Sequence, residues 1–295
     1  NINKMMPSVV HEDESKMSIH AEVGIKAAKK AMDNAGVTPD DIDAVILGTS
    51  HAARNYPSVA IEIQNELGID GYAYDMLVGC SSTTFAINNA VSDISSGIAN
   101  TVLVINPEIS TPFVNYTKRD IHFIFGDGCV ATVVSKNNTS NNSFKVLDRK
   151  LITKFSNNIR SDWSYLARAA SDEKSYDDLL FYQNGNSVFK EVCPLVAEFI
   201  STQLDKNNIK PDEITKFWLH QANARMINLI VSKVIGSNEF DTNLAPLPIQ
   251  KFGNLASAGS MFAFNLNNDL EKGQKGIICS FGAGYSVCSL LVERV

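Results

Sequence analysis

One pattern of strands and helices occurs twice along this chain of 295 residues, once in each half. Residues 41–50 lead from a helix end into a buried strand, Ala44–Gly48, and residues 213–220 do the same in the second half. The motifs Phe125-Gly-Asp-Gly and Phe281-Gly-Ala-Gly then each precede a further strand. A repeat of roughly 150 residues that alternates strands with helices predicts two α/β halves, each with a mixed sheet covered by helices. Matching loops of the two halves are expected to meet at one seam.

Hydrophobic periodicity and turn residues predict where the individual elements lie. Ser18 is expected to cap a helix that Gly36 ends. Further helices are predicted at residues 57–67, 82–96 and 258–270 and after position 220, and strands at residues 44–48, 72–75, 101–106, 130–135, 213–220, 276–280 and 287–293. Residues 136–185 are less regular, and we interpret them as an insertion that covers one face.

The composition is that of an ordinary globular protein, which excludes collagen-like, coiled-coil and disordered classes. With a formal net charge of −6 and no block of Lys or Arg, the chain is not expected to bind nucleic acid. No apolar run approaches the roughly 20 residues of a membrane span, and the first residues lack the apolar core of a secretory signal. We therefore expect a cytoplasmic protein with no membrane attachment. The five cysteines form no Cys-x-x-Cys and no zinc-ligand pattern, which predicts free thiols and no metal site.

Cys80 is the first candidate for chemistry because it lies between a short strand and the start of a helix. Unpaired backbone amides and the helix dipole favour an anion there, so we expect the pKa of this thiol to be lowered. A buried structural thiol is the alternative, which free cysteines often adopt. Cys279 and Cys288 fall inside apolar strands and are assigned to that alternative, as are Cys129 and Cys193.

His220 emerges at the end of a predicted strand, at the edge of the sheet where α/β active sites form. Imidazole can donate to a developing oxyanion or exchange a proton near neutral pH. A core histidine satisfied by hydrogen bonds is the alternative. The polar run Gln221-Ala-Asn-Ala-Arg that follows favours a loop instead.

Asn254 stands in Gly253-Asn-Leu-Ala-Ser-Ala-Gly-Ser, whose small residues permit tight turns and close approach of a ligand. In isolation Asn254 would be an ordinary helix N-cap. The segment Gly282-Ala-Gly can bring backbone amides near a substrate oxygen, although a turn explains these glycines equally well. A cysteine, a histidine and an asparagine at three corresponding strand–loop–helix points are typical of a thiol enzyme that acts on an acyl group.

Five motifs occur in one order along the chain and together resemble the β-ketoacyl-acyl-carrier-protein synthase III family of the thiolase-fold superfamily. They are Gly79-Cys-Ser-Ser, Phe125-Gly-Asp-Gly, His220-Gln-Ala-Asn-Ala-Arg, Gly253-Asn-Leu-Ala-Ser-Ala-Gly-Ser and Phe281-Gly-Ala-Gly. The resemblance implies a five-layered αβαβα fold of two duplicated halves, residues 1–145 with the nucleophile and residues 146–295 with the histidine and the asparagine. It also implies a homodimer.

The resemblance implies an acyltransferase that starts fatty acid or related acyl-chain synthesis. An acyl-CoA primer would acylate Cys80. His220 and Asn254 would hydrogen-bond the thioester oxygen of malonyl-acyl carrier protein as carbon dioxide leaves, and the enolate would attack the acyl group. Backbone amides of Cys80 and Ala283 would form the oxyanion hole. Because loss of carbon dioxide generates the carbanion without a strong base, no metal, flavin or other cofactor is expected.

The resemblance also implies roles in substrate binding. Gly185 and Phe189 would flank the pantetheine tunnel together with Asn223. Tyr56 would cross the dimer interface to the acyl pocket of the partner subunit. Candidates for docking the carrier protein, with solvated surface charge as the alternative, are Arg225 and Lys190.

The chain departs from the family pattern in two places. Family members begin with a strand and a segment whose Trp and Arg help hold the CoA nucleotide, and neither is found before Ser8. Residues 81–84 are Ser-Ser-Thr-Thr, whereas Ala and Gly are common after the nucleophile in the family. The preferred primer could therefore be longer than acetyl, or branched.

Two other functions stay open at the level of the sequence. A hydroxymethylglutaryl-CoA synthase, or an enzyme that joins two acyl chains, often adds a catalytic glutamate near the nucleophile, and Glu62 or Glu108 could reach Cys80. A non-catalytic acyl-binding protein is the third hypothesis, and the intact set of Cys80, His220 and Asn254 counts against it.

Overall fold

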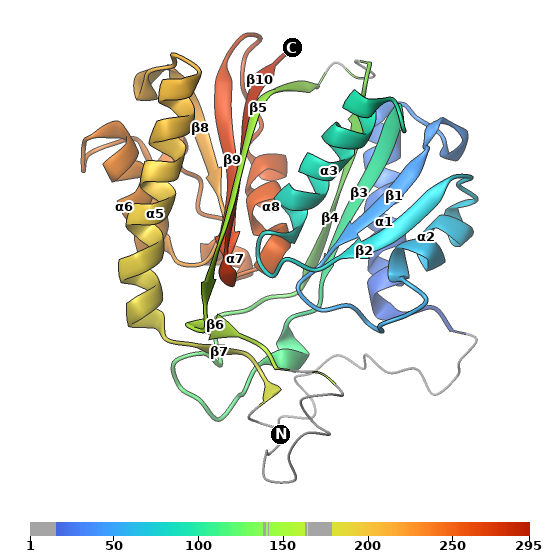
Figure 1. Ribbon diagram of the computed structural model, residues 1–295, viewed down its shortest axis with the longest axis horizontal. Coiled ribbons are helices and arrows are strands. Elements are labelled where there is room, and N and C mark those ends of the chain that lie inside the picture. Colours follow the sequence, from blue (N-terminus) through green and yellow to red (C-terminus); the bar gives the residue numbers. More distant parts are fainter. Residues whose placement is uncertain (1–15, 138–139, 141, 163, 165–178) are drawn as a thin grey trace.

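The computed structural model describes residues 16–137, 140, 142–162, 164 and 179–295. Its elements form five layers: two sheets, a helical layer between them, and one helical layer outside each sheet (Figure 1). Three hydrophobic clusters fill the spaces between these layers. The layer order is the one that the resemblance implied.

The first sheet has the strand order β2-β1-β3-β4, with bounds Tyr72–Met76, Ala44–Gly48, Thr101–Glu108 and Gly128–Ser135. β1 is parallel to β2 and β3, and β4 is antiparallel to β3. Successive side chains of a strand point to opposite faces. Val45 and Leu47 therefore pack with the outer helices, and Ala44 and Ile46 with the inner helix. The outer helices are α1 (Ile19–Ala35) and α2 (Val59–Leu67), and the inner one is α3 (Ser82–Ser96).

The second sheet has the order β5-β10-β9-β8, with bounds Phe144–Ser156, Gly284–Arg294, Lys275–Gly282 and Ile214–Leu219. β8 is parallel to β9, and β10 is antiparallel to β9. Phe217 and Leu219 pack outward, while Trp218 packs into the central cluster. The outer helices are α5 (Gly185–Lys206) and α6 (Ala224–Ile235), and the inner one is α8 (Gly259–Leu266).

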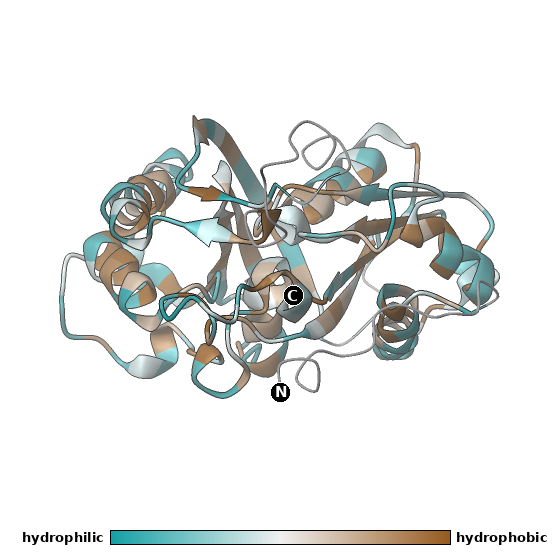
Figure 2. Cartoon of the chain, turned by 90° about the horizontal axis from the view of Figure 1, so that it is seen from below, coloured by the Kyte–Doolittle hydropathy of each residue, from teal (hydrophilic) through white to brown (hydrophobic). Residues whose placement is uncertain are grey.

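Three strands of each sheet repeat one arrangement, because β1, β3 and β4 pair in the same sense as β8, β9 and β10. The fourth strands differ, since β2 pairs with β1 and β5 pairs with β10. Figure 2 shows the hydrophobic strands enclosed between helices whose polar residues face outward. We propose that the halves divide between β4 and β5, slightly before the expected boundary at residue 145, which lies inside β5. The remaining short elements are β6 (Ile159–Arg160), β7 (Tyr182–Gln183), α7 (Ile249–Phe252), η2 (Pro39–Asp41), η3 (Thr111–Phe113), η5 (Pro211–Glu213), η6 (Thr242–Leu244) and η7 (Ala256–Ala258).

The predicted helix ends are confirmed at α1. Ser18 accepts a hydrogen bond from the Ala21 amide at 3.2 Å, and Gly36 ends the helix in the left-handed conformation at φ 66°. α8 stops at Leu266 instead of position 270. The Asn267 side chain bonds back to the Ala263 carbonyl at 3.0 Å, and the Asn267 carbonyl accepts from the Trp218 indole at 2.9 Å. These two bonds fix the chain in a turn that ends the helix.

The prediction of an irregular insertion over residues 136–185 is wrong for residues 144–156. They form β5, which pairs along its length with β10. β5 is an edge strand with much of its surface exposed, so charged residues interrupt the apolar alternation by which strands are recognised. Most of residues 162–178 lies outside the described part of the chain. None of the described helices is both long enough and apolar enough to cross a membrane.

Candidate active site

Cys80 ends the connection from β2 to α3 and lies two residues before the first residue of that helix. Gly79 adopts φ 52°, a conformation that favours glycine, and thereby turns the chain. The Ser82 hydroxyl accepts from the Val78 amide at 2.8 Å and fixes the start of the helix. Cys80 is half-buried and borders two cavities. The predicted strand–turn–helix setting is therefore confirmed.

The first of these cavities, which we call the His220 cavity, has a volume of about 550 Å³. Cys80, His220 and Asn254 all line it, although 174 positions separate the first from the last in sequence. Gly185, Asn223 and Arg225 line the same cavity. Matching ends of strands from both halves thus meet at one hollow, as the repeat predicted.

His220 directly follows β8 and is 2% exposed. Its backbone amide donates to the Cys279 carbonyl at 2.8 Å, and its ring packs edge-on against Phe281 with centroids 5.3 Å apart. Burial lowers the pKa of His220 to about 4, although a hydrogen bond with the Ala256 backbone acts to raise it. The ring is therefore neutral at pH 7 and can donate a hydrogen bond without carrying charge.

Asn254 follows α7, and its backbone pairs with the chain on either side of Phe125. Its amide donates to the Ile124 carbonyl at 2.9 Å, and its carbonyl accepts from the Gly126 amide at 3.1 Å. The side-chain oxygen Oδ1 accepts from the Ala256 amide at 2.9 Å. Because Oδ1 is used in this way, Nδ2 is the group of the carboxamide that is left to donate into the cavity.

The pKa of Cys80 differs from our expectation. Burial, and then the charge of Glu108, raise the pKa of this thiol to about 12, whereas hydrogen bonds from the backbone of Ala283 and Cys80 act to lower it. The predicted lowering at the helix start is wrong because desolvation outweighs the backbone amides. At pH 7 the sulfur is a neutral thiol, so its proton must leave as a substrate engages it.

The Ala283 amide hydrogen-bonds to the Cys80 sulfur, which places both predicted oxyanion-hole residues at the nucleophile. Gly282, the residue before Ala283, packs against the cysteine. A Cβ at this position would lie 2.5 Å from Cys80 Cβ and 3.1 Å from Sγ. Glycine is therefore required here for the backbone of β9 to approach the sulfur.

A second cavity, which we call the His51 cavity, also borders Cys80 and has a volume of about 500 Å³. It adjoins the His220 cavity, since Phe125, Ile159 and Phe181 line both. Its lining includes Cys80, Ala283, His51, Phe113 and Phe181. The His51 ring stacks on Phe113 with centroids 3.8 Å apart. The sequence did not indicate this cavity, because its wall comes from loops with no regular pattern.

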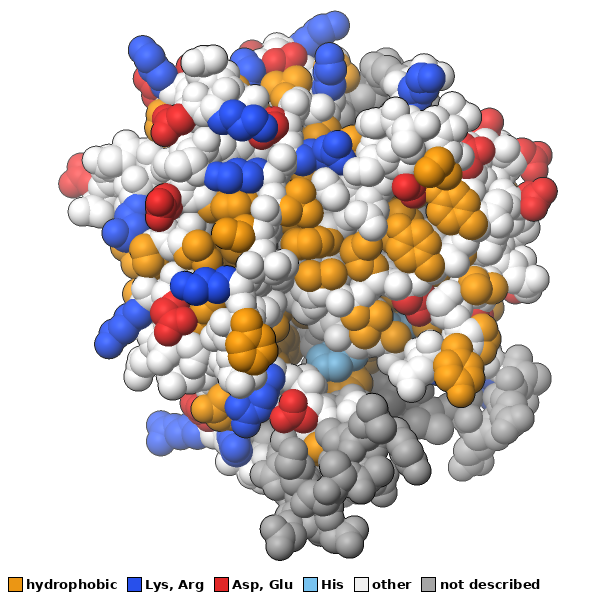
Figure 3. All heavy atoms as spheres, viewed as in Figure 1, with side chains coloured by type: hydrophobic (Ala, Val, Ile, Leu, Met, Phe, Trp, Pro, Cys, Tyr) orange, Lys and Arg blue, Asp and Glu red, His pale blue; other side chains and the backbone are white. Residues whose placement is uncertain are grey.

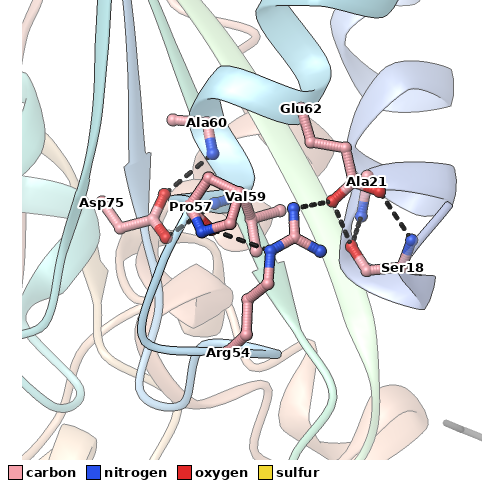
Figure 4. A network of polar contacts seen from close by, with 8 residues as sticks. All are labelled: Ser18, Ala21, Arg54, Pro57, Val59, Ala60, Glu62 and Asp75. Atoms are coloured by element: carbon pink, nitrogen blue, oxygen red, sulfur yellow. Dashed lines mark hydrogen bonds and ion pairs between the residues drawn. The ribbon is translucent and has the colours of Figure 1, made fainter. Parts of the chain in front are cut away.

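Arg54 anchors the loop that forms part of this wall (Figure 4). Its guanidinium donates to the Pro57 carbonyl at 2.8 Å and to Glu62 at 2.6 Å, and Glu62 in turn accepts from Ser18 at the start of α1. Asp75 accepts from the amides of Val59 and Ala60 at 2.8 Å and so caps α2. The loop is thus tied to two helices and to β2.

The other predicted site residues lie as follows. Asn223 caps α6 by accepting from the Arg225 amide at 2.8 Å, and both residues are exposed at the cavity. Phe189 is partly buried against the outer core, and the neighbouring Val188 lines the His220 cavity in its place. Tyr56 is 85% exposed, and Lys190 is exposed on α5.

The two glutamates considered for the alternative enzyme class do not border either cavity. Glu62 is held by Arg54 and Ser18. Glu108 is buried and accepts hydrogen bonds from Ser50 and Ser257. Neither carboxylate is placed to exchange a proton with a substrate on Cys80. Across the described ranges, no group of three or more His, Cys, Asp or Glu side chains could hold a metal ion.

Comparison with known proteins matches two family models to this chain. Residues 74–154 match "3-Oxoacyl-[acyl-carrier-protein (ACP)] synthase III", and residues 204–294 match its C-terminal counterpart. The chain is 42% identical to a beta-ketodecanoyl-[acyl-carrier-protein] synthase of Pseudomonas aeruginosa, over 99% of this chain and 84% of that protein. It is 32% identical to a beta-ketoacyl-[acyl-carrier-protein] synthase III of Campylobacter jejuni, over 92% of this chain and 82% of that protein.

A similar solved structure is the 3-oxoacyl-[acyl-carrier-protein] synthase III of Aquifex aeolicus. It superposes with a TM-score of 0.80 at 25% identity and covers 95% of this chain and 85% of that chain. The fold and the sequence therefore agree on one family.

Proposed function

This chain belongs to the 3-oxoacyl-[acyl-carrier-protein] synthase III family of condensing acyltransferases, and from that premise we propose how its own residues carry out the reaction. One observation carries the proposal: Cys80 borders both cavities, and His220 and Asn254 both line the first of them. A nucleophile that borders two cavities can hold an acyl chain in one and receive a second substrate through the other.

The first step is transfer of the acyl group of an acyl-CoA to Cys80. The sulfur attacks the thioester carbonyl, its proton passes to the departing thiolate, and CoA leaves as the thiol. The backbone amides of Cys80 and Ala283 stabilise the oxyanion of the tetrahedral intermediate. Because the thiol is neutral at rest, proton transfer is coupled to the attack.

The second step joins the acyl group to a malonyl thioester on acyl carrier protein. The bond from Cα to the carboxylate breaks, carbon dioxide leaves, and the electron pair forms an enolate. Neutral His220 and the Asn254 amide donate hydrogen bonds to the enolate oxygen. The enolate carbon then attacks the Cys80 thioester, a carbon–carbon bond forms and the carbon–sulfur bond breaks. The Cys80 sulfur leaves as a thiolate and takes up a proton from water to restore the neutral thiol. No cofactor takes part.

The proposal assigns the pantetheine arm to the His220 cavity and the acyl chain to the His51 cavity. Gly185, Val188 and Asn223 line this cavity and would flank the arm. Arg225 and Lys190 would meet the acidic carrier protein. We propose a medium-length primer, since the relative from Pseudomonas aeruginosa is named for a ketodecanoyl product, two carbons longer than an octanoyl primer. The volume of the His51 cavity, about 500 Å³, supports a chain of that length.

We further propose that two copies of the chain form a homodimer through the face seen in Figure 3. β2 and β5 are edge strands that lie toward the viewer in Figure 1, and hydrophobic side chains gather across this face. Exposed apolar residues along these edges include Leu77, Leu151, Ile152 and Phe155. Tyr56, also exposed, would reach the partner's acyl pocket. The five unpaired cysteines support a reducing cytoplasm as the location.

The test is a condensation assay with octanoyl-CoA and malonyl-acyl carrier protein, followed by mass spectrometry of the carrier. We expect a β-ketodecanoyl-carrier product from the wild type and none from Cys80→Ala. His220→Ala and Asn254→Ala should accumulate acylated enzyme with little product. Normal product from Cys80→Ala, or none from the wild type with any acyl-CoA between acetyl and dodecanoyl, would overturn the proposal.

A further inference from the structure

A buried carboxylate that the proposed mechanism does not use lies beside the active site. Glu108 is the last residue of β3, is 1% exposed, and borders neither of the two cavities. A carboxylate is costly to bury unless hydrogen bonds compensate for the lost water. The hydrogen bonds to the Glu108 carboxylate therefore indicate its structural or functional role.

Hydrogen bonds from three residues, two in one half and one in the other, converge on this carboxylate. Oε1 accepts from the backbone amides of Ser50 at 2.9 Å and Ser257 at 3.1 Å, and also from both serine hydroxyls. Thr49 Oγ1 contacts Oε2 at 3.4 Å. Thr49 and Ser50 follow β1 in the first half, and Ser257 belongs to the second half. Glu108 thus joins the ends of β1 and β3 to residues 254–257.

Residues 254–257 are the turn on which both proposed hydrogen-bond donors depend. The Ala256 amide holds Oδ1 of Asn254 at 2.9 Å, and the Ala256 backbone hydrogen-bonds to His220. Ala256 has φ 43°, a left-handed conformation that residues other than glycine adopt only when their surroundings enforce it. Hydrogen bonds hold the neighbouring Ser257 at both of its backbone groups. Its amide donates to Glu108, and its carbonyl accepts from the Thr83 hydroxyl at 2.6 Å.

We propose that Glu108 is a positioning residue for condensation: by holding Ser257 across the seam between the halves, it fixes the turn that aims Asn254 and His220 at the malonyl thioester. It does not touch substrate. The inference rests on the proposed function of this site and deepens it. Acylation of Cys80 uses backbone amides of residues 80 and 283, which do not belong to this turn, so loss of Glu108 should separate the two steps.

The experiment measures each step in a single turnover by intact-mass spectrometry. Enzyme is first acylated with octanoyl-CoA, and malonyl-acyl carrier protein is then added to consume the acyl-enzyme. For Glu108→Ala we expect acylation within about threefold of the wild type and consumption about 100-fold slower, the size of loss that a misplaced catalytic group causes. Glu108→Gln keeps an acceptor for Ser257 and should recover consumption to within about tenfold of the wild type.

Two further variants keep the test decisive. Asp148 lies on β5, borders neither cavity and pairs with Lys206 at the end of α5. Asp148→Asn removes this carboxylate and should leave both steps unchanged. Ser257→Ala removes one hydroxyl only; it should slow consumption about tenfold and leave acylation intact. If Glu108→Ala does not fold, Ser257→Ala tests the positioning role by the same comparison of acylation with consumption.

The outcomes separate the inference from the function on which it rests. Equal slowing of both steps in Glu108→Ala, or slowing of neither, would overturn the positioning role, as would an unchanged second step in Ser257→Ala. A wild-type acyl-enzyme that malonyl-carrier protein does not consume would overturn the proposed function, and the positioning role with it.

Discussion

At the scale of single residues, Gly282 controls how close β9 comes to the nucleophile. A methyl group there would lie 2.5 Å from Cys80 Cβ, so Gly282→Ala must displace either the Cys80 side chain or the end of β9. The Ala283 amide directly follows that end of β9 and would move with it. We expect acylation by acyl-CoA to slow about 100-fold and stability to fall by about 1–3 kcal/mol. Stopped-flow acylation and urea unfolding measure the two effects.

The matched control is Gly273→Ala. It adds a methyl group that meets no atom within 4 Å at a residue with φ 85°, and so strains a turn without touching the site. It should lower stability by about 1 kcal/mol and leave the acylation rate unchanged. Equal acylation rates in Gly282→Ala and the wild type would refute the close approach.

Burial of His220 also makes the free energy of unfolding depend on pH. Its pKa is about 4 in the folded chain and near 6.5 when unfolded, so the unfolded chain binds its proton first as pH falls. The stabilising contribution of the neutral ring is complete above pH 6.5 and is lost as pH falls through this window toward 4. Burial raises the pKa of Glu108 to about 7, so its neutral form stabilises the fold at low pH. This contribution to stability is complete below the unfolded pKa of about 4.5 and is lost as pH rises to 7.

We therefore predict that His220→Gln loses less stability than the wild type between pH 6.5 and 4.5. The difference should be about 2–3 kcal/mol in the free energy of unfolding, measured by urea titration at each pH. His122→Gln, at an exposed histidine, is the control and should follow the wild type. Parallel curves for His220→Gln and the wild type would contradict the burial of a neutral ring.

The sequence alone predicted that Cys80, His220 and Asn254 would share one site because each lies at a motif with distinctive neighbours, and the structure places all three at one cavity. The strand before His220 and the small residues around Asn254 are visible without coordinates. The pKa of Cys80 was predicted with the wrong sign, since helix position can be inferred from sequence but desolvation depends on packing. Glu108 was noticed as a carboxylate that could reach the cysteine; its partner Ser257 is 149 positions away, and that pairing needs the fold.

At the scale of elements, buried strands were predicted well and the edge strand β5 was missed. Central strands such as β1 are apolar on both faces and read as continuous runs, whereas β5 mixes charged and apolar residues on a partly exposed edge. α5 was also missed, because it follows residues whose pattern is irregular. Elements that pack on two sides are therefore the ones that sequence periodicity identifies.

Trp218 on β8 is the element-scale test of the central layer. The side chain is fully buried, contacts Phe264 edge-on with centroids 4.9 Å apart, and donates to the Asn267 carbonyl at the end of α8. Trp218→Ala should lower the free energy of unfolding by about 3–5 kcal/mol in a urea titration followed by circular dichroism. Leu266→Ala, at a half-exposed position on α8, should cost well under that amount, and equal losses would refute the packing.

At the scale of the whole molecule, the apolar face that carries β2 and β5 predicts association of two copies (Figure 3). Sedimentation equilibrium should give twice the mass of the chain. Ile152→Glu together with Phe155→Glu should shift the protein toward monomer, because charge would be buried at the interface. Lys210→Glu, at an exposed position outside this face, is the control. A wild-type monomer at micromolar concentration would contradict the dimer.

The most direct test of the whole account is the intact mass of the protein after incubation with a panel of acyl-CoAs, followed by peptide mapping. The account predicts one acyl group per chain, attached at Cys80, with medium-length chains transferred fastest, and removal of that group when malonyl-acyl carrier protein is added. An adduct on any other residue, or an acyl-Cys80 that persists with the malonyl carrier present, would contradict it.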